Sequence, residues 1–117
     1  EETLTDKSER FMIEEIIREK ILSETYEEVP HSVAVTVEEM NEKEDITKIF
    51  ATVYVERPSQ KSIIIGKSGS KMKKIGELAR KDIERLLARR VYLDLWGKVY
   101  EKWKKDPNAL RELGYSD

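Results

Sequence analysis

The 117-residue sequence contains no cysteine and only one histidine, His31. Without cysteine the chain cannot form a disulfide framework or a thiolate zinc site, and one histidine is too few for a histidine-rich metal site. No apolar run is longer than four residues, so we expect no membrane span and no signal peptide. These absences indicate a cytoplasmic protein with no cofactor, no metal site and no catalytic residues, because no nucleophile–base pair can be assembled.

Charge is abundant but unevenly distributed, although the formal net charge of the chain is only −2. Residues 57–90 carry eleven Lys or Arg against three acidic residues, a local net of +8. Residues 1–56 carry six basic and sixteen acidic residues, a net of −10, and residues 91–117 carry five of each. A polyanion would therefore be attracted to one part of the molecule and repelled by another.

The length suits one domain over residues 1–117, and the absence of an initiator methionine suggests a fragment of a longer protein. Hydrophobic periodicity predicts a helix that starts within residues 5–9, where Asp6 and Glu9 have capping-box spacing, and ends near residues 23–26. Its apolar stripe consists of Ile13, Ile16, Ile17 and Ile21. Apolar and polar residues then alternate over 33–38 and over 49–55, which predicts an antiparallel hairpin of two strands.

The second half of the chain predicts two helices around a glycine turn, followed by a strand. Pro58 ends the second strand, a short helix covers residues 59–65, and a longer helix starts at Ser70. The buried stripe expected for the longer helix consists of Met72, Ile75, Ala79, Ile83, Leu86 and Leu87. Alternation predicts a third strand over 91–96. A C-terminal helix is expected from Val99 to about Lys105, followed by a last short helical turn over 106–113 that Gly114 ends.

This order of elements predicts an α+β fold with a three-stranded mixed sheet covered by helices on one face. The second and third predicted strands are separated by about 35 residues of helical connection. This length suits a right-handed crossover between two adjacent parallel strands. The expected order is α-β-β-α-α-β, with a further helix at the C-terminus.

The turn Gly66-Lys67-Ser68-Gly69 lies inside the basic stretch. Glycine permits backbone angles that are closed to other residues and removes side-chain bulk, so a nucleic-acid backbone can approach closely. The amides of the following helix, the charge of Lys67 and the hydroxyl of Ser68 all favour phosphate. Three lysines flank the turn, and three apolar residues would line a floor for bases where the core does not use them. These flanking residues are Lys71, Lys73, Lys74, Ile64, Ile65 and Met72.

Two other interpretations of the turn are open. Gly66-Lys67-Ser68 matches the end of a nucleotide-binding P-loop, but that loop also needs a glycine at position 61, which is Lys61. A plain helix–helix turn with glycine caps fits the spacing equally well. The local net charge of +8 favours a phosphate-binding turn over the plain one.

The segment Ile64–Met72, placed between two helices that connect parallel strands, resembles a K-homology (KH) domain. The extra helix and strand that precede the core unit resemble the type II variant of this fold. Further segments resemble the C-terminal KH domain of Era-type GTPases: residues 4–11, 16–20, 28–33, 91–96 and 110–115. Met72 stands where KH domains usually have Ile or Leu, which conserves the volume of the side chain.

The resemblance implies a type II KH domain that binds single-stranded RNA without catalysis, in a chain that lacks the GTPase domain of the family. The implied RNA is the 3′ end of small-subunit ribosomal RNA, bound during assembly of the small ribosomal subunit. The expected RNA-binding residues are Ile64, Ile65, Gly66, Lys67, Ser68, Gly69, Lys71, Met72, Lys73 and Lys74. The edge of the strand over residues 33–40 is expected to complete the groove for the bases.

Several other residues have a structural interpretation. Trp96 and Trp103 have strand and helix spacing, which favours packing over base stacking, and the same holds for Phe50 and Tyr54 on the second strand. The alternative function is a KH-like protein-docking adaptor without RNA contact, in which the acidic first half recognises a basic partner.

Overall fold

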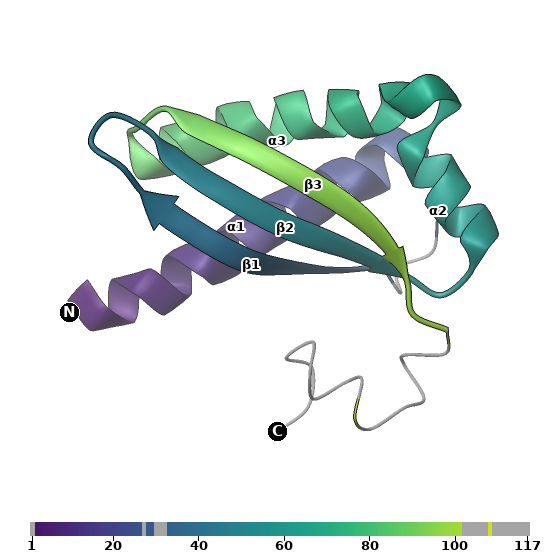
Figure 1. Ribbon diagram of the computed structural model, residues 1–117, viewed down its shortest axis with the longest axis horizontal. Coiled ribbons are helices and arrows are strands. Elements are labelled where there is room, and N and C mark those ends of the chain that lie inside the picture. Colours follow the sequence, from purple (N-terminus) through teal and green to yellow (C-terminus); the bar gives the residue numbers. More distant parts are fainter. Residues whose placement is uncertain (1, 27, 30–32, 102–107, 109–117) are drawn as a thin grey trace.

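The computed structural model describes residues 2–26, 28–29, 33–101 and 108, with side chains described from Ser8 onward. The elements follow the order α1 (Glu2–Thr25), β1 (Ala34–Glu42), β2 (Thr47–Val55), α2 (Pro58–Ile65), a short 3-10 helix η1 (Lys67–Gly69), α3 (Ser70–Leu87) and β3 (Val91–Val99). The order α-β-β-α-α-β is as predicted (Figure 1).

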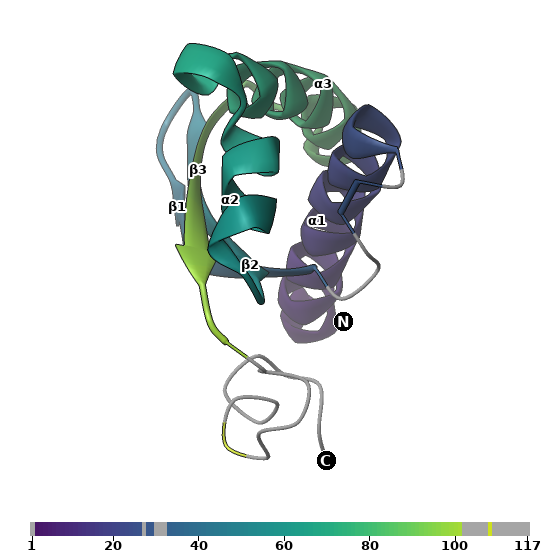
Figure 2. The same cartoon turned by 90° about the vertical axis from the view of Figure 1, so that its right-hand side faces the viewer.

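The three strands form one mixed sheet in the order β1-β2-β3. β1 pairs antiparallel with β2, and β2 pairs parallel with β3, so the predicted hairpin and the predicted crossover are both confirmed. All three α-helices lie on the same side of the sheet (Figure 2). The face turned away from the helices is called the open face below.

The core lies between the helices and the sheet. β2 contributes Ile49, Ala51, Val53 and Val55, whose side chains are at most 1% exposed. The helices supply Ile13, Ile17 and Ile21 from α1 and Ile75, Ala79 and Ile83 from α3, all with 0% exposure. Burial of each large apolar side chain contributes about 1.5–3 kcal/mol, so this layer is the main source of stability.

The edge of β1 is occupied by polar side chains of α1. The carboxylate of Glu14 accepts a hydrogen bond from the amide of Val37 at 2.9 Å, and the guanidinium of Arg10 donates to the carbonyl of the same residue at 3.3 Å. Arg18 donates to the carbonyl of Val33 at 2.9 Å. Helix α1 therefore satisfies backbone groups along this edge, which would otherwise be open to another strand.

Two predicted boundaries and one predicted core residue are wrong. α1 begins at Glu2, so Asp6 and Glu9 lie inside the helix; no proline or glycine interrupts the chain before them. Leu86 is 37% exposed because the buried stripe of α3 advances four residues at a time, and Leu87 rather than Leu86 continues it from Ile83.

The second wrong boundary concerns β3, which continues to Val99, so no helix begins there. Alternation persists through the last pairs of the ladder, where Tyr54 lies opposite Lys98 and Val55 opposite Val99. The remainder of the predicted C-terminal helix and Trp103 lie outside the described residues, as does His31.

Candidate nucleic-acid interface

The glycine turn, Gly66-Lys67-Ser68-Gly69, joins α2 to α3 through left-handed backbone. Gly66, Ser68 and Gly69 have φ angles of 75°, 55° and 78°. The amide of Gly69 donates to the carbonyl of Gly66, and the amide of Ser70 donates to that of Lys67. The side chains of Lys67 and Ser68 are exposed, so the turn presents a cation and a hydroxyl at the surface.

The two glycines of the turn have different surroundings. A Cβ at Gly66 would lie 2.6 Å from the Cβ of Lys71 and 2.8 Å from its backbone nitrogen, so this glycine allows the turn to close against α3. A Cβ at Gly69 would meet no heavy atom within 4 Å. The flank of the turn at Gly69 is therefore open to an approaching backbone.

A groove of about 860 Å³ starts at the glycine turn and runs between the helices and β3. Figure 1 shows α3 extending alongside β3, which is one of the two edge strands of the sheet. The apolar and glycine residues of the lining are Ile46, Ile65, Gly69, Met72, Gly76, Val91, Leu93, Leu95 and Gly97. Its charged and aromatic residues are Lys61, Lys73, Glu77, Arg80, Glu84, Arg90, Tyr92 and Trp96.

The three lysines at the start of α3 point to different places. Lys73 lines the groove, and in the described part of the chain it forms no ion pair. Lys71 instead donates to the carbonyl of Glu24 at 3.0 Å, and Lys74 pairs with the carboxylate of the same residue at 3.4 Å. Lys71 and Lys74 thus hold α3 to the end of α1 rather than facing the groove.

At the far end of the groove, Glu84 joins α3 to β3. One of its carboxylate oxygens accepts a hydrogen bond from the amide of Val91 at 2.8 Å and lies 3.1 Å from the guanidinium of Arg80. The hydrogen bond from Val91 is the main cause that lowers the pKa of Glu84, and the charge of Arg80 acts in the same direction. Glu84 therefore remains ionised at neutral pH and keeps the groove wall in register.

Other cations of the basic stretch are engaged in the fold. Arg85 pairs with Asp82 at 2.9 Å, and the same carboxylate pairs with Lys20 of α1 at 2.7 Å. The hydrogen bond from Lys20 is the main cause that lowers the pKa of Asp82. Arg89 donates to the hydroxyl of Thr47 at 2.9 Å and also to the carbonyl of Lys43.

The comparison with known families fits this geometry. The sequence model described as "KH domain" matches residues 28–104, a range that contains the glycine turn and the lining of the groove. The chain belongs to the KH domain family. KH domains are described as clamping about four nucleotides with a Gly-x-x-Gly loop, and their fold is not catalytic.

Two solved structures of Era are similar to this KH domain over 92% of the chain, each with 40% sequence identity and a TM-score of 0.86. One is a variant of Aquifex aeolicus Era bound to GDP.AlF4⁻. The other is Era in complex with MgGDPNP and nucleotides 1506–1542 of 16S ribosomal RNA.

These two structures confirm both the predicted type II KH fold and the resemblance to the C-terminal KH domain of Era. The chain spans 37% of each Era chain, and the GTPase domain is absent from it. The chain therefore corresponds to the KH domain of Era.

The structure corrects the expected position of two groove components. Ile64 is 1% exposed and belongs to the core of the KH domain, because it is on the face of α2 that packs toward the sheet. The edge of β1 over residues 33–40 is not part of the groove, because α1 covers that edge and the sheet order places β1 farthest from β3. The groove uses β3 instead.

Of the remaining expected residues, Lys71 and Lys74 engage Glu24 of α1 instead of the groove, and Gly66 closes the turn against α3. Ile65, Gly69, Met72 and Lys73 line it, while Lys67 and Ser68 are exposed at its end. Sequence reasoning missed Lys61 and β3. The predicted parallel crossover was a sufficient signal for β3, because helices that connect two parallel strands must pack beside the second of them.

Proposed function

We propose that this KH domain binds single-stranded RNA in the groove, with the sugar-phosphate backbone on the glycine turn. The observation that carries the proposal is the open flank of the turn at Gly69, where no heavy atom lies within 4 Å of an added Cβ. A phosphate can approach the backbone there without meeting a side chain. Lys67 and Ser68 then supply a charge and a hydrogen bond from the same turn.

The groove next to the turn suits bases rather than phosphates. Ile65, Met72 and Leu95 provide apolar surface for base faces, and the glycines at 76 and 97 add no bulk there. β3 is an edge strand, so its outer backbone groups are available to pair with base edges. Lys61 and Lys73 at the rim would attract the backbone on either side of the bases.

The proposed ligand is the 3′ end of small-subunit ribosomal RNA. The solved Era complex contains nucleotides 1506–1542 of 16S ribosomal RNA, and 40% identity over 92% of the chain supports a similar ligand for this KH domain. The proposal covers residues 1–117 as one RNA-binding unit that acts in ribosome assembly in the cytoplasm.

In the described part of the chain, no helix has both the length and the apolar character required to cross a bilayer.

The proposal is tested by titrating the chain with short single-stranded RNAs that match the ribosomal 3′ terminus and with scrambled RNAs of equal composition, each at two ionic strengths. We expect tighter binding of the matched RNA and a loss of affinity for both RNAs at the higher ionic strength. Replacement of Lys67 by Ala should weaken binding and flatten the salt dependence, because one phosphate contact is lost.

Two outcomes would contradict the proposal. One is the absence of RNA binding at low salt by a chain that is shown to be folded. The other is capture of a basic protein that persists after ribonuclease treatment while RNA alone does not bind, which would favour the docking adaptor.

A further inference from the structure

Trp96 of β3 is an exposed aromatic side chain on the open face of the sheet. Its side chain is 63% exposed, whereas Tyr92, four residues earlier on the same face, is 49% exposed. The ring of Tyr92 has an aromatic neighbour, since it lies 6.4 Å from the ring of Phe50 in an edge-on arrangement. Within the described residues, the indole of Trp96 has no such ring contact, which leaves its faces available.

The position of Trp96 joins two surfaces. In the ladder Trp96 is opposite Thr52, which lies between the buried residues Ala51 and Val53 of β2, so the indole belongs to the open face. Trp96 and Tyr92 also belong to the lining of the groove, on the other side of the same edge strand. An extended chain that leaves the groove over β3 therefore meets these two rings first.

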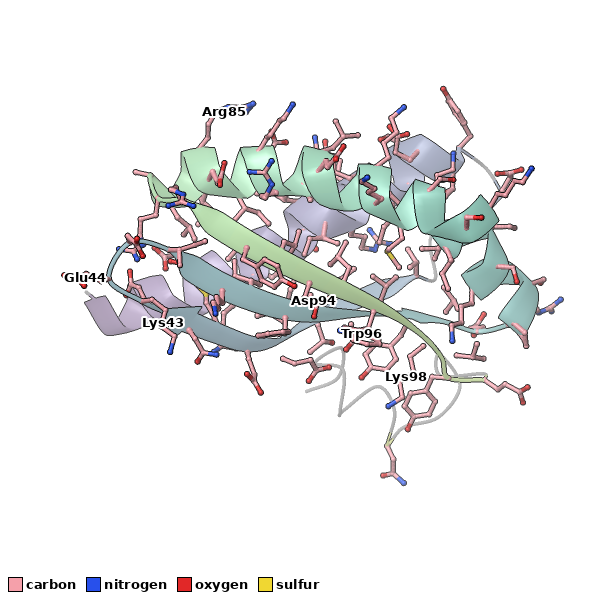
Figure 3. All side chains as sticks on the ribbon, turned by 45° about the horizontal axis from the view of Figure 1, so that its top comes forward. Lys43, Glu44, Arg85, Asp94, Trp96 and Lys98 are labelled. Atoms are coloured by element: carbon pink, nitrogen blue, oxygen red, sulfur yellow. The ribbon has the colours of Figure 1, made fainter. Side chains whose placement is uncertain are left out.

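The charges around Trp96 limit the path that such a chain can take. Lys98 is exposed two residues further along β3, on the same face, and Figure 3 shows Asp94, Trp96 and Lys98 in succession on the side of β3 away from α3. Asp94 would repel a phosphate, so the backbone is favoured toward Lys98. Exposed Glu38 and Glu39 of β1 make the opposite side of the open face unfavourable for a polyanion.

We propose that Trp96 forms a second nucleotide subsite, in which a base stacks on the indole after the RNA has crossed the edge of β3. Lys98 is the phosphate contact of this subsite. The inference rests on the proposed RNA-binding function and extends it from the nucleotides held by the turn to those beyond the groove. Binding sites for single strands combine a basic groove with aromatic stacking platforms in this way, and stacking tolerates any base.

The test uses oligouridines of four, six and eight nucleotides and the variants Trp96→Leu, Trp96→Phe and Phe11→Leu. Phe11 is a matched control, because its side chain is 61% exposed and lies on α1, away from the groove. We expect the unmodified chain to bind the longer oligomers more tightly than the four-nucleotide one. Trp96→Leu should lower the affinity for the longer oligomers by at least about fivefold and the four-nucleotide affinity by a smaller factor, because Trp96 also belongs to the lining of the groove.

A second measurement separates stacking from charge. An eight-nucleotide RNA with one abasic residue, placed in turn at each position beyond the fourth, should bind the unmodified chain more weakly at one position. The Trp96→Leu variant should bind this abasic RNA and the intact RNA with equal affinity, since the abasic residue and the substitution remove the same contact. Trp96→Phe keeps a stacking face and should retain most of the affinity, and Phe11→Leu should behave as the unmodified chain.

The outcomes are distinguishable. If Trp96→Leu weakens all lengths equally, or none, the second subsite is disproved while the proposed RNA-binding function stands. If the unmodified chain binds none of these RNAs and none of the ribosomal RNAs, the function itself fails. Thermal unfolding of each variant verifies that the substituted chains are folded.

Discussion

At the scale of the residue, Gly66 and Gly69 have nearly the same φ but perform different tasks. Gly66 combines φ of 75° with ψ of 179°, a region that only glycine adopts easily, and it is in close approach to Lys71. Gly69 has φ of 78° and ψ of 8°. Among residues other than glycine, Asp and Asn adopt this left-handed conformation most readily. Gly66 is therefore required by the fold, whereas the proposed function assigns Gly69 to the approach of the RNA backbone.

We predict that Gly66→Ala lowers the free energy of unfolding by about 2–3 kcal/mol, because the new Cβ strains the backbone and displaces Lys71. Gly69→Asp should cost only about 1 kcal/mol and should abolish RNA binding, because it adds bulk and negative charge at the open flank. Urea denaturation and RNA titration measure the two effects.

The control for Gly69→Asp is Ala88→Asp, which adds the same charge at an exposed left-handed residue at the other end of α3. RNA binding that survives Gly69→Asp, or that is lost equally in both variants, would contradict the assigned role of the turn.

At the scale of the element, Glu84 couples the end of α3 to the start of β3. Its pKa is lowered in the folded chain, mainly by the hydrogen bond from the amide of Val91, so the ionised form is stabilised by folding. This contribution is complete above the unfolded pKa of about 4.5 and is lost as the pH falls through the lower folded value. Acid should therefore loosen the groove wall at this end.

We predict that Glu84→Gln reduces stability by about 1 kcal/mol at pH 7, and that the difference from the parent shrinks once the pH falls below the unfolded pKa of about 4.5 and disappears below the lowered folded pKa. The amide oxygen of Gln can still accept from Val91, so the variant isolates the charge. Unfolding in urea between pH 3 and pH 7 measures the difference, and Glu44→Gln in the exposed β1–β2 link is the control. A difference that stays constant with pH would disprove this account.

At the scale of the whole molecule, the acidic first half supplies counter-charges that neutralise part of the basic half. Glu24 at the end of α1 pairs with Lys74 at 3.4 Å, and Glu42 of β1 lies 3.7 Å from the guanidinium of Arg89. The formal excess of +8 over residues 57–90 therefore overstates the charge that an RNA meets. The cations that remain for RNA are concentrated along the turn and the groove.

We predict that Lys73→Ala weakens RNA binding several-fold and makes the slope of log K against log salt shallower by about 0.7, the value for one phosphate contact with a single strand. Lys74→Ala, the neighbouring substitution, should have a much smaller effect because Lys74 already pairs with Glu24. Titrations at three or more salt concentrations compare the two, and equal losses in both variants would contradict this distribution of charge.

Patterns local in the sequence were sufficient for most of the fold and for the glycine turn. The alternation of Ile49 to Val55, the four-residue spacing of Ile75, Ala79 and Ile83, and the long helical connection specify strand, helix and crossover. Each depends on neighbours within a few residues or on the length of a segment. The same is true of the turn, because its glycines and its lysine are contiguous.

Contacts between distant segments decided the rest. Which of three nearly adjacent lysines faces the groove depends on Glu24, which comes from α1 and is 47 residues before Lys71. The groove lies on β3 rather than β1 because Glu14 of α1 satisfies the amide of Val37, 23 residues away, and α1 thereby covers that edge. Neither contact leaves a periodic trace in the chain, since each depends on how a whole helix is placed against the sheet.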